Sequence, residues 1–218
     1  MPAPPIPATT IGLVTASLGR PRHLETLRAD VLAQTTTDLT WIVVQQDPAP
    51  AFRPETPQHW ASWEPGARAP VLEGFRRTVL VHIPWQRGLA AARNLGVAVA
   101  WALGCRYIAY ADDDDRLAPG YCAALGLALD ADPTASVAAC WIEDQGQARD
   151  PRTHYSSCSR MARIEACATR PWAPTGPCMD TDYWRQFDGL RTVVVDGPAL
   201  YVCGNAAEGG TRDATGAF

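Results

Sequence analysis

The sequence predicts an α/β protein built on one mostly parallel sheet with helices on both faces. Three observations support this fold class. Short apolar, β-branched segments alternate with helical segments through the first half of the chain. Each helical segment repeats its apolar residues every three or four positions. The length of 218 residues suits one large domain, and strands joined through helices run parallel with right-handed connections.

Strands and helices alternate along the chain. Strands are predicted at residues 11–15, 41–44, 79–83, 107–111, 137–142 and 192–195, and helices at 23–34, 88–103, 121–131 and 179–186. Proline and glycine at the segment ends supply the turns. Residues 49–74 are rich in Pro and Trp without a period, residues 143–152 are predicted as a polar hairpin or loop, and residues 155–168 fit neither pattern.

The composition is that of a globular protein and excludes several function classes. Hydrophobic residues make up 47% of the chain and charged residues 19%. A net charge of -4 argues against nucleic acid or a membrane surface as the main partner. All 19 basic residues are arginine, because the sequence contains no lysine. Lysine Schiff-base chemistry and a phosphate-binding loop with its lysine are therefore excluded.

The seven cysteines, spread without a Cys-x-x-Cys pair, predict a reduced, cytoplasmic protein. His154, Cys158, Cys167 and Cys178 match no standard zinc spacing. No apolar run is long enough for a transmembrane segment, and residues 1–10 lack the features of a signal peptide. We expect residues 1–10 to be a flexible lead.

Four consecutive aspartates, Asp112–Asp115, follow the predicted strand 107–111. One interpretation is a solvated acidic loop in which Asp115 caps the next helix. The other is a cation site, because Mn²⁺ and Mg²⁺ take carboxylate oxygens and usually share them with substrate phosphates. Ligands of open α/β sheets bind beyond the carboxyl ends of strands. The position of the aspartates therefore favours a divalent cation that bridges to a diphosphate.

Other polar residues stand at the ends of predicted elements. Arg87 and Arg93 lie at the start of the helix 88–103. Arg93 is either a surface arginine or a contact to a phosphate or base, and its place one element before the aspartates favours the contact. Asp47, after the second strand, either begins a turn or accepts a hydrogen bond from a nucleobase.

Asp180 and Asp182 lie at the start of the short helix 179–186, where the helix dipole favours carboxylates. Helix capping alone explains one of the two, and we assign that role to Asp182 first. Asp180 is then left as a candidate for chemistry.

Three motifs in order resemble the family 2 glycosyltransferases, which have the GT-A fold. Val-Thr-Ala-Ser-Leu-Gly-Arg-Pro at 14–21 is similar to the nucleotide-binding first strand and helix of that family. Gly-Leu-Ala-Ala-Ala-Arg-Asn at 88–94 is similar to its Gly-x-x-x-x-Arg-Asn helix start. Residues 111–119 resemble its Asp-x-Asp-Asp-x-x-x-Pro segment, and Asp180-x-Asp182 resembles, more weakly, its catalytic-base segment.

The resemblance implies a single GT-A-like domain over residues 11–205, with a nucleotide-sugar-binding half at 11–120, an acceptor-binding half at 121–205 and a flexible tail at 206–218. It implies a metal-dependent inverting transferase, in which a sugar moves from a nucleotide-diphosphate sugar to an acceptor hydroxyl. Asp180 is then the catalytic base, and Asp114 with Asp112 the ligands of Mn²⁺ or Mg²⁺. We expect the donor at Thr15, Ser17, Arg20, Asp47, Arg87, Arg93, Asp112 and Asp113, and the acceptor at Trp172, Asp182 and Trp184.

The sequence departs from the family pattern at a few positions. Gln45 and Gln46 stand where paired aspartates usually end the second strand, and Met179 replaces an acid of the base segment. A catalytically silent nucleotide- or sugar-binding module therefore stays open as an alternative. A nucleotidyltransferase is disfavoured, because residues 16–20 are not a glycine-rich basic loop. The acceptor is unknown, with a small molecule favoured, and a homodimer is left open.

Overall fold

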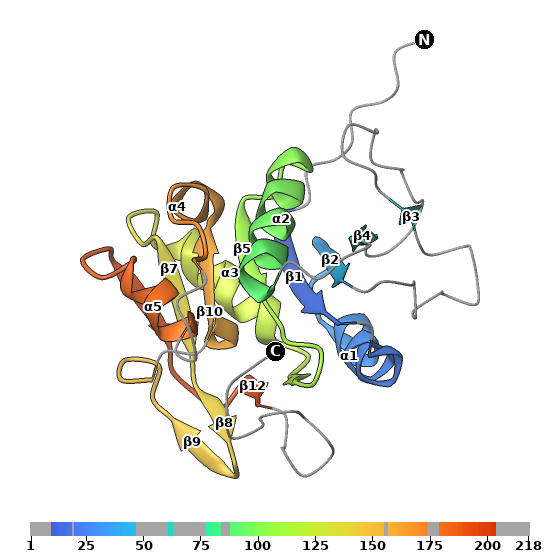
Figure 1. The fold of residues 1–218 in the computed structure, drawn as a ribbon. Helices are drawn as coiled ribbons and strands as arrows, with labels where there is room; N and C mark the ends of the chain where they lie inside the picture. Colours follow the sequence, from blue (N-terminus) through green and yellow to red (C-terminus); the bar gives the residue numbers. More distant parts are fainter. Residues whose placement is uncertain are drawn as a thin grey trace.

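The computed structural model describes residues 10–18, 20–46, 61–62, 77–83, 88–154, 157–173 and 179–203. These residues form the mixed α/β fold that the sequence predicts, with helices on both faces of a mostly parallel sheet (Figure 1).

Two sheets contain the strands of the described residues. The larger has the order β11-β7-β10-β5-β1-β2-β4-β3 and the smaller the order β6-β12-β8-β9. The strands of the larger sheet are β1 (Ile11–Ser17), β2 (Leu39–Gln46), β3 (Ala61–Ser62), β4 (Arg77–Ile83), β5 (Tyr107–Tyr110), β7 (Val137–Cys140), β10 (Arg160–Arg163) and β11 (Thr192–Val195). Those of the smaller sheet are β6 (Arg116–Leu117), β8 (Ile142–Asp144), β9 (Gln147–Arg149) and β12 (Tyr201–Val202).

Helices lie between several of the consecutive strands. They are α1 (Pro21–Ala33), α2 (Leu89–Ala102), α3 (Tyr121–Ala131), α4 (Ile164–Ala168) and α5 (Met179–Arg185), with a short 3₁₀ helix η2 (Ser157–Ser159) before β10. Strands β1, β2, β4 and β5 pair in parallel, as do β7 and β11. Only β10, among the described strands of the larger sheet, runs antiparallel to its neighbours β5 and β7.

Side chains that alternate along the strands fill two cores, one on each face of the sheet. Leu13 and Val43 belong to the core under α1 and α3, whereas Val14 and Ile42 belong to the core under α2, α4 and α5. This two-residue alternation, with both faces buried, explains why β1 and β2 read as continuous apolar runs. Because both faces of the sheet are covered by apolar side chains, polar side chains gather at the ends of the strands.

The chain after the four aspartates is tied to α1. Asp30 accepts hydrogen bonds from the side chain of Arg116 and from the backbone N–H of Leu117. Gln34 donates to the backbone carbonyl of Ala118 (2.9 Å) and accepts from the backbone N–H of Cys122 (3.0 Å). These bonds fix the start of α3 and, with it, the loop that carries Asp112–Asp115.

The differences from the predicted elements lie mainly in the second half of the chain. The segment 155–168, which fits neither pattern, contains β10 and α4. Residues 137–142 divide into β7 and the start of β8, and the polar hairpin is formed by β8 and β9. Short strands of three or four residues give too few positions for a period to stand out, so sequence periodicity cannot separate them.

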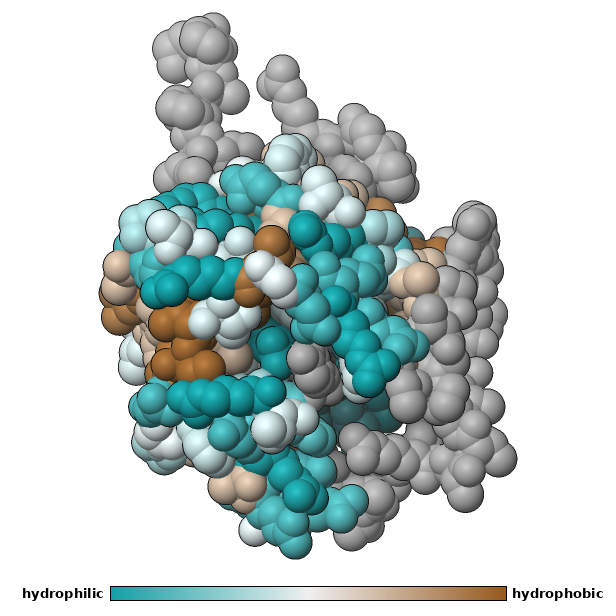
Figure 2. All heavy atoms as spheres, turned by 90° about the vertical axis from the view of Figure 1, so that its left-hand side faces the viewer, coloured by the Kyte–Doolittle hydropathy of each residue, from teal (hydrophilic) through white to brown (hydrophobic). Residues whose placement is uncertain are grey.

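The outer side of the second half, where α4, α5 and β9 lie, is mainly hydrophilic, with hydrophobic residues in smaller groups among the hydrophilic ones (Figure 2). Within the described ranges, each helix is too short or too polar to cross a membrane.

Helix α2 lies unusually close to β1 at Gly96. A Cβ atom built on Gly96 would stand 2.3 Å from Cγ1 of Val14, a stiff β-branched side chain that is buried. Glycine is therefore required by the packing of α2 against the sheet, although it is a poor helix former.

We expect Gly96→Ala to lower the free energy of unfolding by roughly 1–3 kcal/mol, because overpacking outweighs the gain in helix propensity. Urea denaturation followed by circular dichroism measures the change. Gly120→Ala is the matched control, because a Cβ there meets no atom within 4 Å. An equal or greater stability of Gly96→Ala would contradict the close approach.

Candidate active site

The four aspartates lie at the edge of the sheet where β1, β2 and β5 end. Strand β5 runs parallel to β1, and the backbone N–H of Ala111 continues the ladder by donating to the carbonyl of Val14 (3.0 Å). Asp112–Asp115 follow directly, so they lie beside Ser17 at the end of β1. This is the edge at which open α/β sheets bind ligands.

Asp113 is buried and joined to the segment after β1. Its Oδ2 accepts a hydrogen bond from the hydroxyl of Ser17 (2.6 Å) and from Nε of Arg20 (3.2 Å), and its Oδ1 forms an ion pair with the same guanidinium. Burial raises the pKa of Asp113 above its usual value, although Ser17 and Arg20 oppose the shift. Asp113 therefore holds the loop in place, with Ser17 and Arg20 as its partners.

Asp112 and Asp180 share one buried arginine. Arg93, on α2, donates from Nη2 to Oδ1 of Asp112 and from Nη1 to Oδ1 of Asp180, each at 2.6 Å. The side chain of Arg93 is 1% exposed, whereas those of Asp112 and Asp180 are each 34% exposed. The arginine thus lies behind two carboxylates that water and ligands reach from the front.

Burial by itself would lower the pKa of Arg93, but the charges of Asp112 and Asp180 outweigh it and raise that pKa well above the ordinary value. The guanidinium stays charged. Burial raises the pKa of Asp112, and Asp180 adds to the shift while Arg93 opposes it. The face of an aromatic ring also stabilises the cation, because the guanidinium carbon lies 4.3 Å from the ring centre of Trp172.

Asp115 faces the C-terminal part of the described chain. The hydroxyl of Tyr201, on β12, donates to Oδ2 of Asp115 and accepts from the backbone N–H of Asp112 (3.3 Å). Oxygen atoms of Asp112 and Asp115 and the sulfur of Cys158 lie within 4.8 Å of one another. Asp115 does not cap α3, whose first residue follows Gly120 without a side-chain cap.

The burial of Asp113 and Asp115 is incompatible with a fully solvated acidic loop. The side chains of the two predicted metal ligands, Asp112 and Asp114, are 34% and 30% exposed, and Asp114 lies 3.5 Å from Nη1 of Arg20. Asp114 is not a member of the Asp112, Asp115 and Cys158 group. The loop therefore presents carboxylates of two kinds, with Asp113 and Asp115 directed to protein partners and Asp112 and Asp114 reaching solvent.

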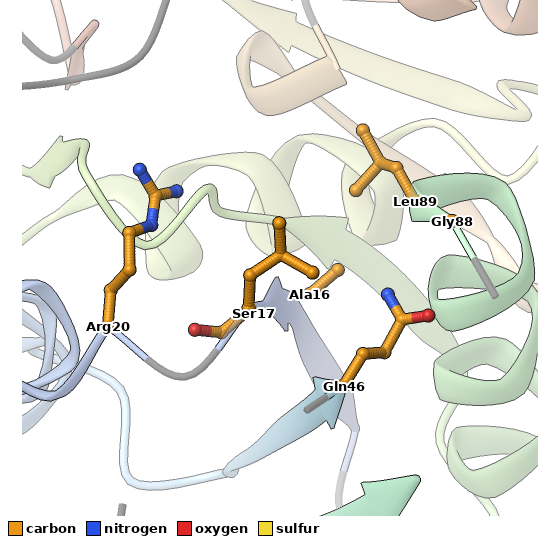
Figure 3. A pocket seen from close by; sticks show the side chains of 7 residues that line it. Ala16, Ser17, Arg20, Gln46, Gly88 and Leu89 are labelled. Carbon is orange, nitrogen blue, oxygen red and sulfur yellow. The ribbon is translucent and has the colours of Figure 1, made fainter. Parts of the chain in front are cut away.

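A cavity of about 180 Å³ opens beside this loop (Figure 3). Its walls are apolar at Ala16, Leu18 and Leu89, and Ser17, Arg20 and Gln46 add polar groups. Gly88, before α2, completes the lining. Because Ser17 and Arg20 also contact Asp113, the cavity and the acidic loop form one continuous site.

Trp172 and Trp184, predicted to contact an acceptor, belong to an aromatic cluster. Trp172 stacks on Tyr183 with ring centres 3.7 Å apart, and its backbone N–H and carbonyl are both held by the side chain of Asn94. Trp184 is 0% exposed and packs edge-on against Tyr183. Both rings are buried in this structure, since Trp172 is 3% exposed, and their contact to an acceptor stays a prediction.

The remaining predicted site residues are only partly gathered here. Asp182 lies on α5 and pairs loosely with Arg185 at 3.8 Å. Thr15, within β1, is buried, its hydroxyl accepts from Nε1 of Trp41 (2.9 Å), and it does not line the cavity. Asp47 and Arg87 lie outside the described residues.

Sequence reasoning missed Tyr201, the position of Cys158 beside Asp112 and Asp115, and the role of Asn94. Tyr201 lies near the end of the predicted domain, after the last predicted strand, and only its aromatic side chain indicates a buried position. Cys158 lies in the segment without a period. Asn94 was seen in a motif, but its bonds to Trp172 join residues far apart in sequence, and no local pattern predicts such a pair.

Comparisons with known proteins identify a matching family and several solved structures with a similar fold. Residues 54–193 match the family described as glycosyl transferase family 2. The structure of S. aureus TarS 1-349 superposes with a TM-score of 0.68 at 11% identity, over 89% of this chain and 60% of that chain. The same protein in complex with UDP-GlcNAc gives a TM-score of 0.66 at 11% identity, over 89% of this chain and 58% of that chain.

A mannosyltransferase from Pyrobaculum calidifontis, PcManGT in complex with GDP-Man and Mn²⁺, gives a TM-score of 0.60 at 15% identity. The alignment covers 89% of this chain and 56% of that chain. The chain thus spans about three fifths of the length of these structural neighbours. Comparison of the sequence with curated proteins gave no match.

We expect Arg93→Lys to lower the free energy of unfolding by roughly 1.5–3 kcal/mol, because one ammonium cannot reproduce two bonds from separate nitrogens. Urea denaturation measures the loss. Arg185→Lys is the control: its guanidinium is exposed and 3.8 Å from Asp182, so a change below about 0.5 kcal/mol is expected. Equal effects of the two substitutions would contradict the bridging role of Arg93.

Proposed function

Because the chain belongs to glycosyl transferase family 2, we propose that it is a metal-dependent inverting glycosyltransferase. It moves a sugar from a nucleotide-diphosphate sugar to a hydroxyl of an acceptor, with a small molecule as the favoured acceptor class. One observation carries the proposal: solvent-reaching carboxylates at the carboxyl ends of β1 and β5 lie beside a cavity on one side and, through Arg93, next to Asp180 on the other.

The fold is GT-A, as the sequence predicts, and it matches solved glycosyltransferases along most of the chain. Two of these neighbours were solved with different nucleotide sugars, UDP-GlcNAc and GDP-Man. Their likeness to this chain therefore supports a nucleotide-sugar donor. It does not specify the base or the sugar, which depend on the residues of the site.

Asp112 and Asp114 are proposed to hold Mn²⁺ or Mg²⁺. Hard divalent ions take carboxylate oxygens, and these two side chains are the ones that reach solvent. The nearby thiol of Cys158 suits such an ion poorly, because sulfur is a soft ligand and burial raises its pKa well above the usual value. When bound, the ion supplies positive charge that stabilises a diphosphate leaving group.

Asp180 is proposed as the base that takes the proton of the acceptor hydroxyl. A base must be ionised, and a guanidinium 2.6 Å away favours the charged carboxylate. Arg93 also fixes the position of Asp180 relative to Asp112, and so relative to the donor. One displacement with one base on the far face of the sugar inverts its configuration. Asp182, on the same helix and half-buried, is the proposed acceptor contact.

We expect Asp180→Asn to lower kcat by about 10²–10⁴-fold, because the amide cannot accept the proton. Nucleotide binding should be preserved, since Asp180 does not line the cavity. Turnover is measured as release of the nucleoside diphosphate from a panel of nucleotide sugars. Asp188→Asn, the same change at an exposed position after α5, is the control. Near-normal turnover of Asp180→Asn would remove this residue from the role.

Metal dependence is tested by calorimetry with nucleoside diphosphates. In the presence of Mn²⁺ we expect Kd to be at least about tenfold lower than with a chelator, a difference of about 1.4 kcal/mol. Asp114→Ala should lose this difference, and Asp188→Asn should keep it. Affinity that is independent of the ion and of Asp114 would contradict the cation site. Tight binding without any turnover would instead favour the silent binding module.

A further inference from the structure

We propose that Asn94 is a positioning residue for the reaction: it holds Trp172, and Trp172 holds the helix that carries Asp180. This inference rests on the proposed function and deepens it, because it names a second link between the proposed base and the rest of the site. The preceding residue of α2, Arg93, provides the first link through its hydrogen bond to Asp180. Two adjacent residues of α2 therefore act on one carboxylate by different routes.

The side chain of Asn94 makes two hydrogen bonds to the backbone of a single residue. Its Nδ2 donates to the carbonyl of Trp172 (2.9 Å), and its Oδ1 accepts from the N–H of Trp172 (2.8 Å). A carboxamide offers a donor and an acceptor side by side, as this pair of bonds requires. Asparagine is also a weaker helix former than the alanine and leucine at many other positions of α2. The two bonds, rather than helix formation, therefore explain an asparagine inside this helix.

Trp172 connects this clamped backbone to α5. Its ring stacks on Tyr183 with ring centres 3.7 Å apart and an angle of 8° between the ring planes. The guanidinium carbon of Arg93 lies 4.3 Å from the centre of the same indole ring. Trp172 is thus in contact with the arginine that binds Asp180 and with the helix to which Asp180 belongs. A shift of the clamped backbone would move both contacts.

Tyr183 ties α5 to the strand that leads into the acidic loop. It follows Asp180 by three positions, so the two residues lie about one turn apart on neighbouring parts of the helix surface. The seven residues of α5 are too few for a helix that is stable alone, so its position depends on packing. The hydroxyl of Tyr183 lies 3.1 Å from that of Tyr110, the last residue of β5. The stack and the hydroxyl contact therefore set the place of Asp180 relative to the acidic loop.

Loss of this support is expected to affect turnover rather than donor binding. A general base acts only within hydrogen-bond reach of the proton that it takes, and a misplacement of about 1 Å can lower the rate by about 10²-fold. Asn94 does not line the cavity, and the hydrogen bond from Arg93 to Asp112 does not involve it. A substitution that only destabilised the protein would instead lower the folded fraction and leave the turnover of each folded molecule unchanged.

The experiment compares Asn94→Ala with the unchanged protein. Nucleoside diphosphate release is followed with Mn²⁺ and a panel of nucleotide sugars that includes UDP-GlcNAc and GDP-Man, with water as the acceptor. Water removes any direct contact between Trp172 and an acceptor from the measurement. The value of kcat is expressed per nucleotide-binding site, counted by calorimetric titration with UDP and GDP. We expect kcat per site to fall by about 10- to 100-fold while Kd stays within about threefold.

A double-mutant cycle tests the route through Trp172. Trp172→Leu removes the ring that stacks on Tyr183, and Trp172→Phe keeps an aromatic ring there, so Trp172→Phe should retain more of kcat. Adding Asn94→Ala to Trp172→Leu should lower kcat by less than about threefold, because coupled residues have non-additive effects. Effects of the two substitutions that multiply would contradict the route.

Arg163→Ala is the matched control. The guanidinium of Arg163 donates to the backbone carbonyls of Ala135 (2.8 Å) and Leu129 (2.7 Å), so this variant also removes two bonds from a side chain to the backbone. Arg163 pairs with Tyr107, the first residue of β5, and therefore lies at the end of the sheet opposite the acidic loop. Arg163→Ala should lower stability and leave kcat per site unchanged.

Hydrogen exchange of the α5 amides gives a readout that does not need turnover. Asn94→Ala should speed this exchange more than Arg163→Ala does, because only the former loosens the packing of α5. Unchanged kcat per site in Asn94→Ala, or exchange of α5 no faster than in the control, would overturn the role of Asn94. An unchanged protein that neither binds a nucleoside diphosphate nor turns over any donor would overturn the proposed function itself.

Discussion

The structure depends on how four adjacent negative charges are compensated at one edge of a sheet. Each carboxylate has its own environment: Asp113 is held by Ser17 and Arg20, Asp115 by Tyr201, and Asp112 by Arg93. Buried charges are stable in proteins only when they are paired and hydrogen-bonded. Asp114 keeps a third of its side chain in water. The loop can therefore fold as a fixed structure while part of its charge stays available to a ligand.

Arg93 has a second consequence for the site. It joins Asp112, in the half of the domain proposed to bind the donor, with Asp180, in the half proposed to bind the acceptor. The two carboxylates are 68 positions apart in the sequence numbering, and one guanidinium sets their spacing. The guanidinium of Arg93, between the two halves, keeps a leaving group and a base aligned. Neither Asp112 nor Asp180 can move without breaking its hydrogen bond to Arg93. Trp172 supports the guanidinium from its face, and Asn94 fixes Trp172 in turn.

Much of the fold could be predicted from the sequence. The strands β1, β2, β4 and β5 and the helices α1, α2 and α3 have clear apolar patterns, and the helical and strand periods identify them. The acidic loop could be placed at a strand end for the same reason. The antiparallel β10 and the two-residue strands β6 and β12 could not be predicted, because they are defined by pairing partners far away in the chain. The hairpin of β8 and β9, by contrast, lies where a polar hairpin or loop was predicted. Likewise Ser17, Arg20 and Arg93 were expected to touch a ligand, whereas the structure also gives each of them an aspartate partner.

Tyr201 has an implication for how the protein acquires its site. Its hydroxyl contacts Asp115, 86 residues earlier in the chain, and β12 completes the smaller sheet between β6 and β8. During synthesis on the ribosome, β1, β5 and the aspartates emerge long before this tyrosine does. Until then the hydrogen bond from Tyr201 to Asp115 is absent. The contact between Tyr201 and Asp115 is therefore among the last contacts of the acidic loop that translation makes possible, and a nascent chain halted before residue 201 would lack it.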